Sequence, residues 1–154
     1  MITRTTVSGL AALAMMGTGL AATAQDLPAP VEARQGQFKM MALNVGVLAN
    51  MVRGNTEYDA AAASTAAANL VAISQIDQSF HWPEGTDNFA LDGTRALPAI
   101  WENLPDVIEK WQAYGAAAEG LAAVAGDGLE PMRAAFGPVG GTCGACHDDY
   151  RASE

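Results

Sequence analysis

The stretch GGTCGACHDDYR, Gly140 to Arg151, holds both cysteines of the chain and one of its two histidines. Cys143, Cys146 and His147 form a Cys-x-x-Cys-His pattern, which is typical of covalent c-type haem attachment. Two thiols one helical turn apart match the two vinyl groups of a haem, so that each forms a thioether bond. The following imidazole then reaches the iron from the same side. The stretch predicts one haem c, bound through Cys143 and Cys146, with His147 as the iron ligand.

Two non-haem interpretations of this stretch stay open. Cys143, Cys146 and His147 would supply three zinc ligands, with His81 as the fourth. Alternatively, the cysteines would form a thioredoxin-like dithiol, but that motif belongs to a strand–helix unit. The sequence has no run of alternating apolar and polar residues long enough for a strand. A zinc protein would be colourless, so colour separates it from a haem protein.

The N-terminal segment, residues 1–24, has the order of a secretory signal peptide. Arg4 precedes an apolar run, and Ala22-Thr23-Ala24 matches an A-x-A cleavage site. The apolar run is short and interrupted by glycine, which argues against a membrane span. We expect residues 1–24 to be cleaved, leaving residues 25–154 as one domain with no attachment to a membrane.

The net charge of the chain limits the classes of partner that it can bind. Seventeen acidic residues against eight lysines and arginines give a net charge of −9, and cleavage removes Arg4 as well. Such an acidic protein is a poor ligand for nucleic acid or anionic lipid. The sequence also lacks a phosphate-binding glycine loop, a serine nucleophile elbow and a paired-histidine metal helix. A basic protein partner is compatible with this charge.

Apolar residues at helical spacing predict an all-α protein. We expect helices over residues 30–53, 59–76 and 98–125, and a fourth from about 129 to the C-terminus. Pro105 predicts a break early in the third helix, and Pro138 predicts a kink or restart in the fourth. Residues 77–97 are expected to form a long irregular loop. Short connections elsewhere favour an antiparallel up-and-down four-helix bundle. The expected core stripe of the first helix is Val31, Gln35, Phe38, Met41, Ala42, Val45, Leu48 and Val52.

The mature chain resembles the cytochrome c′ family, the class II c-type cytochromes of the bacterial periplasm. Cytochrome c′ is itself a standard example of the up-and-down bundle. The resemblance rests on four motifs: Arg34-Gln35 with Phe38 one turn later, Pro-x-Ile-Trp at 98–101, RAAFG at 133–137, and CGACHDDYR at 143–151. It implies a periplasmic location for the mature protein.

The resemblance places four polar residues near the haem propionates: Arg34, Gln35, Thr94 and Arg95. Arg34 and Phe38 are four residues apart and share a helix face. A guanidinium entering an apolar stripe needs an anionic partner, and a propionate would match its fork. A salt bridge between Arg34 and a nearby carboxylate stays open as the alternative.

The resemblance also implies how the iron is used. Arg151 would lie beside the proximal imidazole of His147, and Phe38 would face the distal side, where no protein atom binds iron. The family is associated with electron transfer and with binding of NO and CO. The alternative is a six-coordinate, low-spin electron carrier with a methionine ligand, for which Met41 is the candidate.

We expect no enzymatic activity. A haem peroxidase needs a distal acid–base group, and the first helix offers none beside Phe38; only His81 in the long loop would serve. The expected partners are a redox protein of unknown identity and the small ligands NO and CO. The resemblance is also compatible with a homodimer packed through the first two helices.

Overall fold

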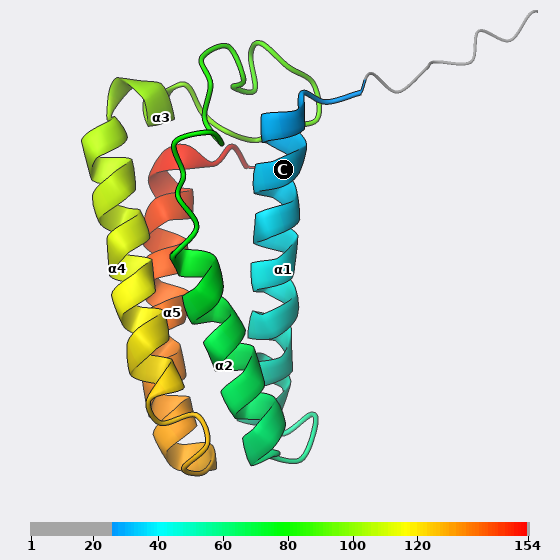
Figure 1. Cartoon of the computed structure of the whole chain (residues 1–154), viewed down its shortest axis with the longest axis vertical. Helices are drawn as coiled ribbons and strands as arrows, with labels where there is room; N and C mark the ends of the chain where they lie inside the picture. The colour runs from blue at the N-terminus through cyan, green and yellow to red at the C-terminus, as the bar shows by residue number, and fades with distance from the viewer. Residues whose placement is uncertain (1–25, 154) are drawn as a thin grey trace, which may run out of the picture.

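The computed structural model describes residues 26–153, so the predicted signal peptide lies outside the described residues. Four long helices lie side by side, with α1 and α4 running opposite to α2 and α5 (Figure 1). Helix α2 packs on α1 and α4, and α5 packs on α4 and α1. The prediction of an all-α four-helix bundle is confirmed. The helices are α1 (Ala29–Val52), α2 (Ala60–Ser74), α3 (Ala99–Glu102), α4 (Leu104–Ala122) and α5 (Leu129–Tyr150).

The ends of α1 and α2 follow from local chemistry. Pro30 occupies the first turn of α1, where its missing N–H would have had no partner. Gly54 follows this helix with φ +73°, a conformation that glycine adopts without strain. Asp59 caps α2, because its carboxylate accepts a hydrogen bond from the Ala62 amide at 2.9 Å. The expected start of α2 is therefore confirmed, and its end lies two residues earlier than predicted.

The predicted third helix is divided into two. The short α3 ends at Glu102, and Asn103 has φ −138° and ψ 50°, outside the helical region. Pro105 then occupies the first turn of α4. Proline lacks a backbone N–H and is tolerated only in the first turn of a helix, so the chain breaks ahead of Pro105 rather than at it. The predicted break is confirmed, and α4 ends at Ala122 rather than at residue 125.

Of the kink or restart predicted at Pro138, the restart is wrong and the kink stays a prediction. Helix α5 continues through this proline from Leu129 to Tyr150. Met132 and Val139, on either side of the proline, are both fully buried. Packing of both halves against the bundle offsets the hydrogen bond that proline cannot make.

The predicted core stripe of α1 is only partly correct. Val31, Met41 and Leu48 are buried, whereas Ala42 is exposed and Phe38 retains 36% of its accessible surface. The structure instead buries three polar residues of α1: Arg34, Gln37 and Asn44. The side-chain Oδ1 of Asn44 accepts a hydrogen bond from Nδ2 of Asn69 on α2 at 2.9 Å. A hydrophobicity pattern misses these positions, because their burial depends on partners from other elements.

The main core lies away from the cysteine motif along the bundle. Its fully buried large side chains are Leu48, Leu70, Leu121, Met132 and Val139. Alanines on α2, among them Ala63, Ala66 and Ala67, are buried against the neighbouring helices. Small side chains allow these helices to approach closely. The long loop and the cysteine motif lie at the opposite end of the bundle (Figure 1).

Candidate functional site: a haem-attachment motif under a loop

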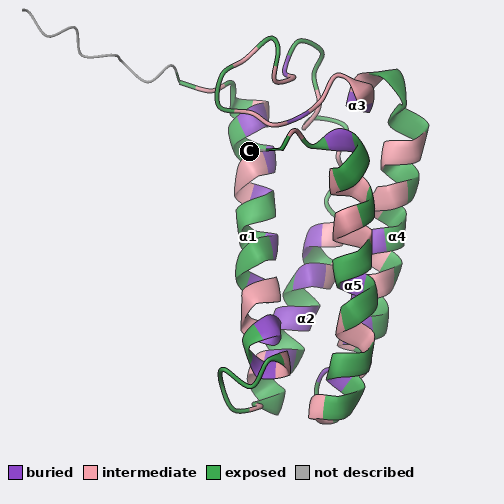
Figure 2. Ribbon diagram, turned by 180° about the vertical axis from the view of Figure 1, so that it is seen from behind, coloured by how far each residue is buried: buried purple, intermediate pink, exposed green. Residues whose placement is uncertain are grey.

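The motif lies in the last turns of α5, at the end of the bundle that carries the long loop and α3 (Figures 1 and 2). Cys143, Cys146 and His147 are all partly exposed, and neither cysteine forms a disulfide. Cys146 packs against a small cluster made by Ala96, Ile100 and Tyr150. The end of the loop, α3 and the end of α5 therefore meet at one thiol of the motif.

Both thiols are disfavoured as anions. Burial raises the pKa of Cys143, and burial is also the main cause of the raised pKa of Cys146. Covalent attachment of a haem c would use both thiols as uncharged thioethers. Moreover, no group of three or more His, Cys, Asp or Glu side chains among residues 26–153 is arranged to hold a metal ion. The donor set fits a haem better than zinc.

Two arginines lie close to His147. Burial lowers the pKa of His147, and the positive charges of Arg151 and Arg95 lower it further. Arg151 follows α5 and pairs with Ala96 in an antiparallel bridge. The loop and the C-terminal end are further joined by the Leu97 amide, which donates to the Tyr150 carbonyl at 3.1 Å. The predicted neighbourhood of Arg151 and His147 agrees with this arrangement, while the role of Arg151 stays a prediction.

Aromatic rings from α1, the loop and α4 form a continuous series of contacts. Phe38 lies 6.4 Å from Trp82 and 6.4 Å from Trp111, centroid to centroid. Trp111 in turn contacts Tyr114 at 5.2 Å, and Trp82 contacts Trp101 at 6.2 Å. Burial is the main cause of the raised pKa of Tyr114. These distances are typical of favourable aromatic pairs.

The polar groups of three of these rings donate to backbone carbonyls. The Trp101 indole donates to the Trp82 carbonyl at 2.9 Å, and the Trp111 indole donates to the Ser74 carbonyl at 2.9 Å. The Tyr114 hydroxyl donates to the Leu70 carbonyl at 3.0 Å. The rings around Phe38 are thus held in place and present carbon surfaces rather than acid–base groups.

Arg34 is buried, with 2% of its surface exposed, and it reaches the loop rather than a carboxylate. Its Nη1 donates to the His81 carbonyl (3.1 Å) and the Thr86 hydroxyl (2.8 Å). Its Nη2 donates to the Thr86 carbonyl (2.5 Å) and the Thr94 hydroxyl (3.1 Å). The guanidinium also lies 4.7 Å from the centre of the Trp82 ring. Arg34 therefore holds several turns of the loop against α1.

The charge of Arg34 is not neutralised by a carboxylate within residues 26–153, so the predicted alternative of a surface salt bridge is wrong. A buried cation normally has an anionic partner. Four of its five N–H groups are engaged by the loop, which leaves Nε as the donor for a further acceptor. A propionate would supply the missing negative charge, so this position also fits a haem.

The other predicted propionate contacts are placed differently. Gln35 donates from Nε2 to the Gly93 carbonyl at 2.7 Å. Thr94 accepts from Arg34, and Arg95 donates from Nε to the Ala152 carbonyl at 2.8 Å. All three residues thus join the loop to α1 or to the C-terminal end, and their contact with a propionate stays a prediction.

Met41 is the candidate for a sixth iron ligand, and His81 is the candidate for a zinc ligand or an acid–base group. The two residues lie in different settings. Met41 is buried in the main core, with 8% of its surface exposed, three residues after Phe38. His81 is partly exposed, and its Nδ1 pairs with the Gln78 amide oxygen at 3.1 Å. Met41 therefore faces the interior, whereas the imidazole of His81 is engaged within its own loop.

Sequence reasoning missed three contributors to this end of the bundle. Thr86 accepts from Arg34 through both its hydroxyl and its carbonyl. Tyr150 donates to the Asp106 carboxylate at 2.5 Å, and Lys110 bridges Asp106 (3.6 Å) and Asp149 (3.1 Å). Asp149 and Tyr150 lie within the CGACHDDYR motif, and Thr86, Asp106 and Lys110 lie in none. The sequence gives no sign of these contacts, since they depend on how the loop and α4 pack against α5.

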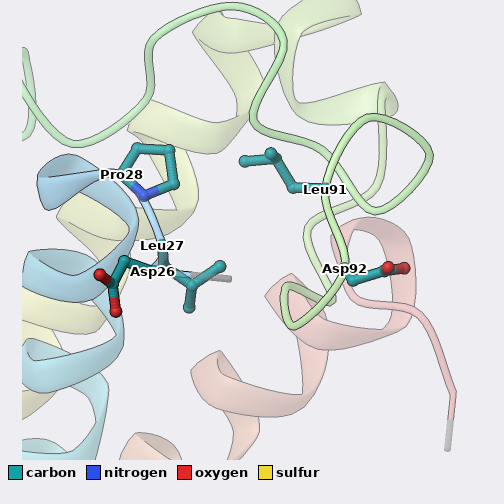
Figure 3. A pocket seen from close by; sticks show the side chains of 5 residues that line it. All are labelled: Asp26, Leu27, Pro28, Leu91 and Asp92. Atoms are coloured by element: carbon teal, nitrogen blue, oxygen red, sulfur yellow. The ribbon is translucent and has the colours of Figure 1, made fainter. Parts of the chain in front are cut away.

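A small surface hollow of about 110 Å³ lies beside the loop, between the start of α1 and Leu91 (Figure 3). Asp26, Leu27, Pro28 and Asp92 complete its lining. It is too small for a haem and is separate from the motif in sequence. Along residues 26–153, no helix is long and apolar enough to cross a membrane.

Comparison with known proteins agrees with this architecture. The family model described as cytochrome c′ matches residues 29–151. A cytochrome c′ of Cereibacter sphaeroides is 42% identical over 142 residues, covering 92% of this chain and 95% of the relative. The match includes both the arginine end of α1 and the cysteine motif.

Solved structures give the same result. A cytochrome c′ from Rhodobacter spheriodes aligns with a TM-score of 0.79 at 42% identity, over 81% of this chain and 96% of that one. A ferrous variant of the Alcaligenes xylosoxidans cytochrome c′ with bound NO aligns with a TM-score of 0.70 at 33% identity, over 81% and 94% of the two chains. Another variant of that protein carries carbon monoxide. This chain belongs to the cytochrome c′ family, whose members carry one covalently bound haem c.

Proposed function

We propose that this protein is a periplasmic carrier of a five-coordinate haem c, which transfers electrons and binds small neutral ligands such as NO and CO. Cys143 and Cys146 would hold the haem by thioether bonds, and His147 would be the single protein ligand of the iron. The proposal is supported by family membership and by one observation above all: the neighbouring rings of Phe38 are those of Trp82 and Trp111, each 6.4 Å away between centroids.

When bound, the haem would supply an iron that can exchange one electron and bind a small neutral ligand. The residues of the chain would then decide what reaches that position. Phe38 has no atom able to ligate iron and no hydrogen-bond donor for a bound oxygen. An apolar wall of this kind favours CO and NO over stable O₂ binding, because bound O₂ gains most from a nearby donor.

Arg34 would serve both the loop and the haem. Its four Nη hydrogen bonds hold residues 81–94 in place, and its charge would offset that of a propionate. On the opposite side, the charges of Arg151 and Arg95 favour the neutral form of His147. A neutral imidazole is the form that ligates iron.

The test of haem attachment is the mass of the exported protein. Maturation with haem-attachment machinery should add the mass of one haem, and the mass should persist after denaturation. The Cys143→Ser and Cys146→Ser variants should each weaken this attachment, and the double variant should abolish it. An unmodified wild-type mass from a strain that matures a control cytochrome would contradict the proposal.

A second candidate function is a low-spin electron carrier with Met41 as the sixth ligand. The burial of Met41 three residues after Phe38 favours it. The Met41→Leu variant separates the two functions. Its spin state, read from the visible spectrum, should equal that of the wild type if the sixth position is free. A change from low spin to high spin would assign the ligand to Met41.

A further inference from the structure

The loop between α2 and α3, residues 77–97, displays two phenylalanines to solvent. We name it the capping loop. Phe80 and Phe89 are 82% and 83% exposed, more than any other large apolar side chain in the described part of the chain. The outer turns of this loop are the exposed regions at that end of the bundle (Figure 2). Exposed aromatic rings are unfavourable in water unless a partner covers them, and aromatic residues are enriched at interface cores.

Each phenylalanine follows a turn fixed by an aspartate. The Asp77 carboxylate accepts from the Ser79 amide at 2.8 Å, directly before Phe80. The Asp87 carboxylate accepts from the amides of Phe89 (2.8 Å) and Ala90 (3.1 Å). The hydrogen bonds from Ser79 also lower the pKa of Asp77. Each ring is thus presented by an ordered turn with a negative charge beside it.

The capping loop is held at several points along its length. Arg34 binds the middle of the loop, and the Asn88 amide donates to the Ala96 carbonyl at 2.8 Å. The Leu97 amide donates to Tyr150 at its end. A loop ordered in advance loses little conformational freedom on binding, which favours its use as a recognition surface.

The charge of the capping loop selects the partner. The loop contains four carboxylates, Asp77, Glu84, Asp87 and Asp92, against Arg95 as its one arginine or lysine. The whole chain has a net charge of −9. Apolar anchors surrounded by negative charge complement an apolar patch that is ringed by lysine or arginine.

We propose that the capping loop is the docking surface for a basic redox protein, with Phe80 and Phe89 as its apolar anchors. This inference rests on the proposed function as an electron carrier and names the class of partner. The loop adjoins the end of α5, through the Leu97 amide and the bridge between Ala96 and Arg151. A partner seated on the loop therefore lies beside the residues that would hold the haem.

The test measures electron transfer from the reduced holoprotein to ferric mitochondrial cytochrome c, a basic haem protein, by stopped-flow absorbance. The wild-type second-order rate should fall steeply with ionic strength. The Phe80→Ser/Phe89→Ser double variant should react about tenfold more slowly at low salt, because it lacks both apolar anchors of the docking surface. Leu43→Ser, which changes a 70% exposed leucine in the middle of α1, is the matched control and should leave the rate unchanged.

A second oxidant distinguishes failure of the docking proposal from failure of the proposed function. Ferricyanide is too small to need the docking surface, so all variants should react with it at the wild-type rate. Normal ferricyanide oxidation with no difference between the double variant and the wild type would overturn the docking surface alone. An absence of oxidation by ferricyanide in the wild type would overturn the proposed function as well. A wild-type dimer that the double variant loses in gel filtration would assign the rings to a second copy and also overturn the proposal.

Discussion

The two ends of the bundle differ in the kind of side chains that α1 buries. At the end away from the motif, α1 buries Leu48 and Met51 against the alanines of α2 and the apolar side chains of α4 and α5. At the motif end, the same helix buries Arg34 and Gln37, and its partners are a loop and a group of aromatic rings. One helix therefore contributes an apolar core at one end and a polar site at the other. Changes at the two ends should separate stability from haem chemistry.

The largest effect on stability is expected at the apolar end. Leu121 is fully buried in the main core, so Leu121→Ala should lower the free energy of unfolding by about 2–5 kcal/mol. Denaturant unfolding of the holoprotein measures this change. The spectrum of the folded variant should remain that of the wild type, and a changed spin state would contradict the separation of the two ends.

A smaller loss is expected when the buried cation is removed. Arg34→Met retains the apolar stem but leaves the acceptors on Thr86 and His81 without their donor. The free energy of unfolding should fall by about 1–3 kcal/mol. Amide hydrogen exchange should accelerate in residues 81–94 and not in α2. Uniform acceleration across the bundle would contradict the role of Arg34 in holding the loop.

Tyr114 connects the two ends and gives a pH-dependent effect. Tyr114→Phe removes one hydrogen bond to the Leu70 carbonyl, at a cost of about 0.5–1.5 kcal/mol. Burial raises the pKa of Tyr114 from 10.0 to about 12. The folded protein thus retains a proton that the unfolded chain loses, and stability declines as the pH rises from 10 to about 12. The stability difference between wild type and Tyr114→Phe should shrink over that range, and a constant difference would contradict the burial of this hydroxyl.

The smallest effect is expected at a surface ion pair of α5. Arg133 and Glu130 pair one turn apart and both remain well exposed. Arg133→Gln should change the free energy of unfolding by no more than about 0.5 kcal/mol, and the change should vanish in high salt. A larger loss that persists in salt would indicate that the hydrogen bond from Arg133 to the Val52 carbonyl matters more than the ion pair.

The sequence predicts the parts of this fold that depend on local chemistry. The capping of α2 by Asp59, the break before Pro105 and the spacing of the haem motif can each be deduced from a few adjacent residues. The continuity of α5 through Pro138 cannot, because it depends on the burial of Met132 and Val139 against other helices.

The same contrast holds for the site. Arg34 could be recognised as a buried cation that needs acceptors, but its acceptors are backbone and hydroxyl groups of the loop rather than carboxylates. A long loop without periodicity gives no sign of which carbonyls will face inward. The aromatic contacts of Phe38 likewise join three separate elements that no local pattern relates.

The most direct test of an open iron site facing Phe38 is the visible spectrum of the dithionite-reduced holoprotein before and after addition of CO. The account predicts a high-spin ferrous spectrum that changes to that of the CO complex. A sharply split low-spin spectrum that CO does not alter would contradict it and would assign the sixth position to a protein ligand such as Met41.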